Sequence, residues 1–97
     1  MRIISTKVIK DFYFDHPNAE PTLTEWIREV RQAIWETPNQ LRQLYPTASI
    51  LPGNRAVFRL GGGKYRLIVV IHYNRQIVYI RFIGTHAEYD RIDPLTI

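Results

Sequence analysis

The sequence predicts an α+β fold in which N-terminal helices pack on one face of a small, mostly antiparallel β-sheet and a short helix follows the last strand. Apolar residues recur at helical spacing in the first half of the 97 residues, whereas they alternate with polar residues in the second half. No repeat, low-complexity tract or linker divides the chain. We therefore expect one domain that spans residues 1–97.

The first elements expected are a short strand and a helix. The strand covers Arg2–Ile4 and stops at Ser5 and Thr6, because either hydroxyl can cap a following helix. The helix ends at His16–Pro17, since a proline disfavours helical backbone in the residue before it. Its apolar residues at helical spacing are Ile9, Phe12 and Tyr13.

Two more helices are expected before the sheet. The second begins near Asn18, with Pro21 in its first turn. Its apolar stripe consists of Leu23, Trp26, Ile27, Val30 and Ile34. The third begins after Thr37, which caps it, and carries Gln40 at the third position. Its inward side chains are Leu41 and Leu44.

Three alternating segments after Pro52–Asn54 predict an antiparallel meander over residues 55–60, 64–73 and 76–83. A two-residue loop at Asn74–Arg75 sets the register of the last hairpin. The expected pairs are Ile71–Val78, Val69–Ile80 and Leu67–Phe82. These residues form a wholly apolar face, on which we expect the helices to pack.

The opposite face of this sheet collects cations. In the expected register Arg81 lies opposite Ile68 and diagonal to Arg66, about 7–8 Å away. If Gly62–Gly63 forms the preceding loop, Arg55 joins the same face. The cations expected at one end of the face are Arg59, Lys64, Arg66 and Arg81. A solvated face that discourages aggregation is the plainer explanation, but clustered like charges favour a site for an anionic ligand.

The segment after the last strand adds polar groups beside these cations. Gly84 lets the backbone turn, and Thr85 with Glu88 makes the T-x-x-E pattern of a capping box. A short helix then places His86 and Tyr89 on one face, over the cations. In the plainer alternatives both are packing residues, and the nearby Asp90 pairs with Arg91 or Arg81.

Composition narrows the possible chemistry. The chain has 13 Lys and Arg against 9 Asp and Glu, which favours a polyanionic partner. It has no cysteine, no histidine pair at zinc spacing and no run of membrane-spanning length, so we expect a cytoplasmic protein with no membrane, metal or cofactor. RNA cleavage by its own 2′-hydroxyl is the chemistry that these residues fit, with cations at the phosphate and His86 or Tyr89 in proton transfer.

The segments "GGGKYRLIVVIHY" and "YIRFIGTHAEYD" resemble the HigB toxins of type II toxin–antitoxin systems. Further likeness lies in "MRIIS", "HPNAEPTLTEWIREV", "YPTASIL" and "VFRLGGGKYR". The resemblance implies the RelE-like fold, cleavage of mRNA typically in the ribosomal A site, and catalytic roles for Arg66, Arg81, His86 and Tyr89. We expect Arg55, Arg59 and Lys64 to bind RNA through their charge.

Three functional hypotheses follow. The first is a metal-independent mRNA interferase, an endoribonuclease that inhibits translation and is silenced by a cognate helix-turn-helix antitoxin of the HigA type. The second is a non-catalytic RNA-binding or regulatory module that grips phosphate with the same face. The third is a degenerate toxin retained only as a partner for its antitoxin.

Overall fold

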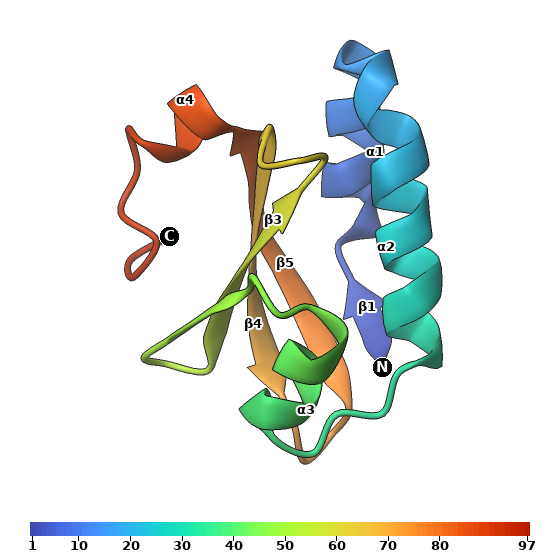
Figure 1. Cartoon of the computed structure of the whole chain (residues 1–97), viewed down its shortest axis with the longest axis vertical. Helices are drawn as coiled ribbons and strands as arrows, with labels where there is room; N and C mark the ends of the chain where they lie inside the picture. The colour runs from blue at the N-terminus through green and yellow to red at the C-terminus, as the bar shows by residue number, and fades with distance from the viewer.

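A five-stranded sheet forms the centre of the structure, a computed structural model that describes residues 1–97. The strands lie in the order β1-β5-β4-β3-β2, and only β1 and β5 pair in parallel (Figure 1). They are β1 (Arg2–Ile4), β2 (Ser49–Leu51), β3 (Arg55–Leu60), β4 (Tyr65–His72) and β5 (Ile77–Thr85). The predicted α+β class and meander are therefore confirmed, while β2 is a strand that no alternating run predicts.

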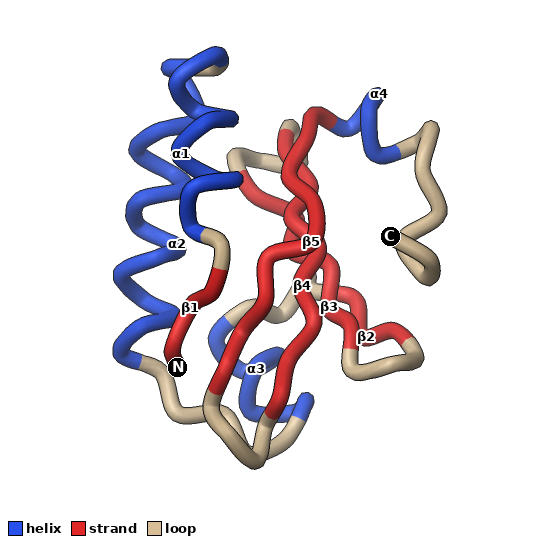
Figure 2. The backbone as a smooth tube through the Cα atoms, turned by 180° about the vertical axis from the view of Figure 1, so that it is seen from behind, coloured by secondary structure: helices blue, strands red, loops and turns tan.

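The N-terminal helices cover one face of this sheet. They are α1 (Thr6–Asp15), the 3₁₀ turn η1 (Pro17–Ala19), α2 (Glu20–Gln32) and α3 (Pro38–Leu44). Figures 1 and 2 show α1 and α2 on one side of the sheet, and α4 (His86–Tyr89) with the C-terminus on the other. None of these helices has the length and apolar composition needed to cross a bilayer.

The ends of α2 and α3 decide which apolar side chains reach the core. The hydroxyl of Thr37 accepts a hydrogen bond from the Gln40 amide at 3.4 Å, as expected of a cap, and Leu41 is buried. Leu44 is 45% exposed and Ile34 is 74% exposed. Both were expected inside, and both predictions are wrong: α2 ends before Ile34, and Leu44 lies at the last turn of α3.

Aromatic side chains join the helices to the sheet around Phe58 of β3. The rings of Trp26 and Tyr45 meet Phe58 edge-on, with centroids 5.3 Å and 5.1 Å away. The Tyr45 hydroxyl donates to Glu29 of α2 at 3.1 Å. Burial, with the nearby Glu29 carboxylate, raises the pKa of Tyr45, so this phenol stays protonated and keeps donating at neutral pH.

The β4–β5 hairpin has the predicted register next to its turn. The confirmed pairs are Ile71–Val78 and Val69–Ile80. The side-chain amide of Gln76 donates to the carbonyl oxygens of Trp35 at 2.7 Å and Tyr73 at 2.8 Å. The turn of the hairpin is thereby fixed to the segment that follows α2.

A β-bulge interrupts this register farther along the hairpin. Ile68 pairs with Phe82 and not with Arg81, which is an extra residue without a partner. Beyond the bulge Ile83 pairs with Leu67 and packs against the core, where Phe82 was expected. The predicted Leu67–Phe82 pairing is therefore wrong, because one inserted residue exchanges the faces of all the residues that follow it.

Candidate functional site

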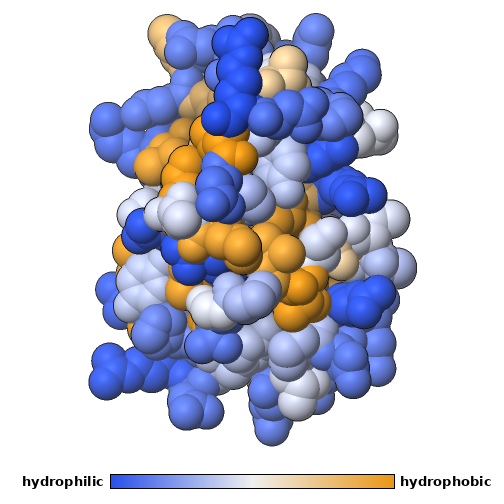
Figure 3. All heavy atoms as spheres, turned by 90° about the vertical axis from the view of Figure 1, so that its left-hand side faces the viewer, coloured by the Kyte–Doolittle hydropathy of each residue, from blue (hydrophilic) through white to orange (hydrophobic).

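The sheet face that turns away from α1 and α2 carries four arginines, and a lysine lies in the turn beside it. We call these five cations the basic face: Arg55, Arg59, Arg66 and Arg81 on the strands, and the exposed Lys64 in the β3–β4 turn. The ion pairs of the molecule are Lys7–Asp11, Glu25–Arg28 and His86–Asp90. None of the five cations is therefore paired with an aspartate or glutamate side chain. Figure 3 views the side of the molecule where α4 and the C-terminus lie, and an apolar strip there is surrounded by hydrophilic residues.

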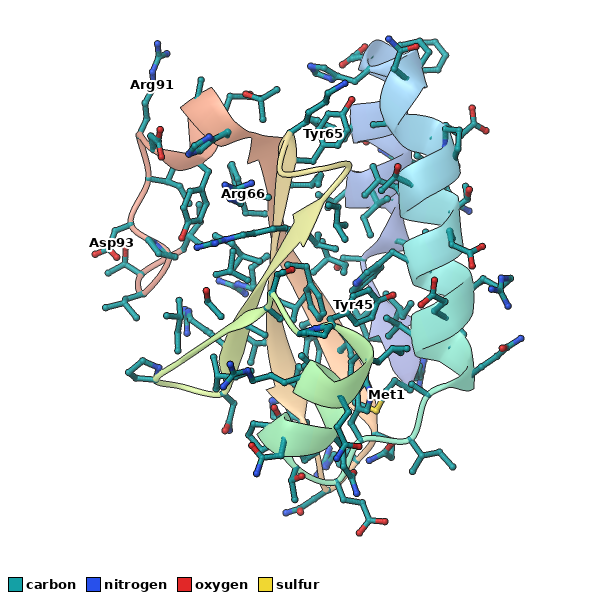
Figure 4. All side chains as sticks on the ribbon, in the orientation of Figure 1. Met1, Tyr45, Tyr65, Arg66, Arg91 and Asp93 are labelled. Atoms are coloured by element: carbon teal, nitrogen blue, oxygen red, sulfur yellow. The ribbon has the colours of Figure 1, made fainter.

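Arg66 is the most constrained of these cations. It is 8% exposed, and it is the only charged residue among the buried ones. Figure 4 shows Arg66 pointing from β4 toward the side of α4, while its neighbour Tyr65 points toward the helices. The guanidinium donates to the Gly63 carbonyl at 2.5 Å and lies 5.8 Å from the centre of the Tyr89 ring. A buried cation without a counter-ion is costly, so this arrangement favours the binding of an anion.

The β3–β4 turn supports both Arg66 and α4 through its backbone. Gly61, Gly62 and Gly63 have φ values of 63°, 68° and 90°, in the left-handed region that glycine adopts without strain. Besides the Gly63 carbonyl that holds Arg66, the Lys64 carbonyl accepts a hydrogen bond from the His86 amide at 3.0 Å. The turn thus fixes the distance between the guanidinium and the start of α4.

Gly84 does not turn the chain, contrary to the prediction. Its lack of a side chain instead leaves space where β5 meets α4. It lies opposite Arg66 in β5 and has no left-handed φ. A Cβ atom there would stand 2.6 Å from the Phe82 ring and 3.2 Å from Glu88 Cβ. Any side chain at this position would therefore push Phe82 or α4 away from the site.

The predicted capping box of α4 is confirmed. The Thr85 hydroxyl accepts from the Glu88 amide at 3.2 Å, and Glu88 Oε1 accepts from the Thr85 amide at 2.9 Å. The hydrogen bond from the Thr85 backbone lowers the pKa of the Glu88 carboxyl, since it stabilises the ionised form. The capping box thus fixes the first turn of α4. Tyr89, which lies one turn after Thr85, is placed over Arg66.

His86 has a different neighbour from Tyr89. Its Nε2 lies 3.4 Å from Asp90 Oδ1, and both side chains are more than half exposed. The plainer alternative paired Asp90 with Arg91 or Arg81, and the structure pairs it with His86 instead. The spacing of four residues within a short helix is the signal that predicts such a pair. The structure therefore brings Tyr89 onto the buried cation and holds His86 beside a carboxylate.

Arg55 and Arg81 both contact the C-terminal segment, and Arg81 lies between Arg55 and Arg66 along the sheet. Arg55 donates from Nε to the Pro94 carbonyl at 3.1 Å and from Nη2 to the main-chain oxygen of Ile97 at 2.8 Å. Arg81, the bulged residue, donates from Nε to the same Ile97 oxygen at 3.4 Å. No feature of the sequence predicts that the C-terminal segment folds back onto these arginines.

The other two histidines lie beside aromatic rings. His72 meets Tyr79 edge-on with centroids 5.2 Å apart. His16 stacks on Phe12 at 4.2 Å, and its Nδ1 lies 3.1 Å from the Phe12 carbonyl oxygen. No group of three His, Asp or Glu side chains is arranged to hold a metal ion.

The chain matches a known protein family over residues 19–92, which include all five cations and α4. The family is described as HigB_toxin, RelE-like toxic component of a toxin-antitoxin system. Two relatives are mRNA interferase toxin HigB from Escherichia coli strain K12 and mRNA interferase HigB from Shigella flexneri, each 26% identical over 92 residues, or 93% of this chain and 88% of the relative. An mRNA interferase HigB from Escherichia coli O6:H1 is 26% identical over 94 residues, or 95% of this chain and 91% of the relative. The chain belongs to the HigB family of RelE-like toxins of toxin–antitoxin systems.

Proposed function

We propose that this toxin is a metal-independent endoribonuclease that cleaves mRNA by attack of a 2′-hydroxyl on the adjacent phosphate. The observation that carries the proposal is Arg66, a buried cation with no counter-ion beneath the ring of Tyr89. The relatives named mRNA interferase support the same class of activity.

In the proposed reaction a base removes the proton of the 2′-hydroxyl, and the 2′-oxygen then attacks phosphorus. The bond from phosphorus to the 5′-oxygen breaks, and an acid protonates that oxygen as it leaves. The products are a 5′-hydroxyl and a 2′,3′-cyclic phosphate, or a 3′-phosphate where water opens the ring. Arg66 and Arg81 stabilise the negative charge that grows on the phosphoryl oxygens, because a guanidinium donates two parallel hydrogen bonds to such a group.

Proton transfer falls to Tyr89 first and to His86 second in this proposal. Tyr89 lies against the Arg66 guanidinium, so a phosphate held by Arg66 is within its reach. His86 is held by Asp90 on the exposed side of α4, where it can contact the RNA farther from the phosphate. Tyr89 and His86 also offer rings on which an unpaired base can stack.

The remaining cations bind the RNA and do not take part in the chemistry. Arg59 and Lys64 are exposed beside Arg66, and Arg55 lies at the far end of the basic face. They fit phosphates on either side of the cut, which positions the strand without reading its bases. We propose that the ribosome presents the mRNA in its A site, as the resemblance to HigB toxins implies.

A cognate antitoxin of the helix-turn-helix, HigA-like type is the proposed inhibitor, and it acts by covering the basic face or by blocking entry to the ribosome. We expect the two proteins to co-purify in a fixed ratio, and the complex to lose cleavage activity. A complex that cleaves as fast as the free toxin would contradict this assignment.

The test is single-turnover cleavage of mRNA on programmed ribosomes, with one substrate that lacks the 2′-hydroxyl at the cut site. The deoxy substrate should remain intact while the normal one is cut, since the nucleophile is missing. Cleavage of both at equal rates rules out the mechanism. Ribosomes that bind the toxin while neither mRNA is cut would favour the non-catalytic RNA-binding module.

A further inference from the structure

The C-terminal segment contacts the sheet in an unusual way. Residues 94–97 make hydrogen bonds to the sheet only through the guanidinium groups of Arg55 and Arg81. Arg55 uses adjacent donors, Nε and Nη2, on two carbonyl oxygens, and Arg81 shares one of those oxygens. Here one arginine donates from one edge of its guanidinium to two oxygens, and a second arginine donates to one of the same oxygens. This arrangement is typical of a phosphate-binding site.

We propose that Arg55 and Arg81 form a phosphodiester-binding site that residues Pro94–Ile97 occupy in the free toxin, and that RNA enters by displacing this segment. The identity of the ligand as RNA rests on the proposed function. The main-chain oxygens of Pro94 and Ile97 stand in for two oxygens of one phosphate, so the same donors are satisfied in both states.

The segment is held in a way that permits its release. Its other hydrogen bonds are local, because the amides of Leu95, Thr96 and Ile97 all donate to Asp93. Leu95 is 50% exposed, while Pro94 and Ile97 are half-buried. The segment can therefore leave as a small preformed turn without opening the core of the helix-covered face.

The segment and RNA use the same charged guanidinium donors, so the acceptor decides the competition between them. A phosphodiester presents two oxygens of one anionic group to these donors, and the released segment regains conformational freedom. The segment nevertheless weakens RNA binding while it occupies the site. A segment that is closed in nine molecules out of ten lowers the apparent affinity about tenfold.

The first test follows the segment in the full-length chain. Because the chain has no cysteine, Leu95→Cys gives one attachment point for a nitroxide spin label at an exposed position. The probe is a short RNA with a 2′-deoxy residue that blocks cleavage. We expect saturating RNA to convert the label to a mobile spectrum, and Arg55→Ala with Arg81→Ala to give that spectrum without RNA. A label that stays immobile with RNA bound overturns the proposal.

The second test measures affinity. Removal of residues 94–97, which carry no charged side chain, should tighten binding of the same RNA about tenfold in fluorescence anisotropy. The same deletion in the Arg55→Ala, Arg81→Ala background should bring no gain, because the contested site is absent. An equal gain in both backgrounds, or no gain in either, contradicts the proposal.

Failure of this inference can be told from failure of the proposed function. Both tests use RNA that cannot be cut, so they report on displacement and not on catalysis. A toxin whose segment leaves on RNA binding, but which does not cleave on ribosomes, retains the site and loses the nuclease assignment. Cleavage with a segment that never moves gives the reverse result.

Discussion

Arg66 is the residue at which stability and activity should oppose each other. Its guanidinium is buried without a counter-ion, which costs folding energy that an apolar side chain of similar length avoids. We expect Arg66→Met to raise the free energy of unfolding by about 1–2 kcal/mol in urea titrations. The same change should lower the single-turnover cleavage rate on the order of 10²–10³, as expected for a lost transition-state contact.

Arg66→Lys is the matched control, since it keeps the charge and loses the two-pronged donor geometry. It should recover only a small part of the rate. A destabilised Arg66→Met protein would mean that the hydrogen bond to Gly63 outweighs the cost of the buried charge.

The two proton-transfer candidates can be separated by conservative substitutions. Tyr89→Phe keeps the ring on Arg66 and removes only the hydroxyl, so it should lower the cleavage rate strongly while RNA affinity is nearly unchanged. His86→Gln should have the smaller effect, because His86 is turned toward Asp90. Both are measured as single-turnover rates with saturating toxin. The opposite ranking would make His86 the principal base.

At the scale of elements, α4 should be a locally weak helix on which the site depends. Thr85→Ala removes the cap and should cost about 1 kcal/mol. Cleavage should fall by more than this loss of stability explains, because Tyr89 would leave Arg66. Thr37→Ala, the cap of α3, is the matched control, with a similar cost and unchanged cleavage.

Low pH should destabilise α4, as the Thr85→Ala substitution does. The folded structure holds Glu88 ionised, so its pKa is lowered, and the stabilisation is complete above the ordinary carboxyl pKa. It is lost as the pH falls through the lowered value, because the protonated carboxyl accepts the Thr85 amide hydrogen bond poorly. Amide exchange of α4 should therefore accelerate in acid for the natural chain more than for Glu88→Gln, which does not titrate.

The elements with strong local signals are those that the sequence predicts well. The caps at Thr37 and Thr85 combine side-chain and backbone signals within four residues, and both are confirmed. The bulge at Arg81 could not be predicted, because Phe82 and Ile83 are both apolar and either can face the core. Periodicity also failed to locate the end of α2, since Ile34 continues the stripe after the helix has stopped.

In the candidate site, too, local patterns predict the positions of residues, whereas long-range contacts cannot be predicted from the sequence. Strand alternation places Arg55, Arg59 and Arg66 on one face, as the structure has them. The fold-back of residues 94–97 depends on long-range contacts from β3 and β5, for which a short C-terminal turn has no local signal. The role of each predicted site residue in cleavage stays a prediction.

At the scale of the whole molecule, charge should govern RNA affinity. If three to five of the basic-face cations contact phosphate, a plot of log K against log salt should have a slope of about −2 to −3.5 for single-stranded RNA. Arg59→Ala should make this slope shallower by about 0.7. Arg42→Ala removes the same charge from α3 on the helix-covered side, and it should leave the slope unchanged.

This comparison separates local contacts from net charge. Equal changes of slope in the two variants would mean that RNA senses the overall charge of +4 and not the basic face.

The glycine turn between β3 and β4 has a consequence for genetics. A Cβ atom at Gly61 would stand 2.8 Å from the Tyr65 ring, and all three glycines have left-handed backbone. Substitutions there would displace the carbonyls that hold Arg66 and α4, although the glycines offer RNA no side chain. Cells that survive expression of a randomly mutated toxin gene should therefore carry changed glycine codons at 61–63 alongside changed arginine codons.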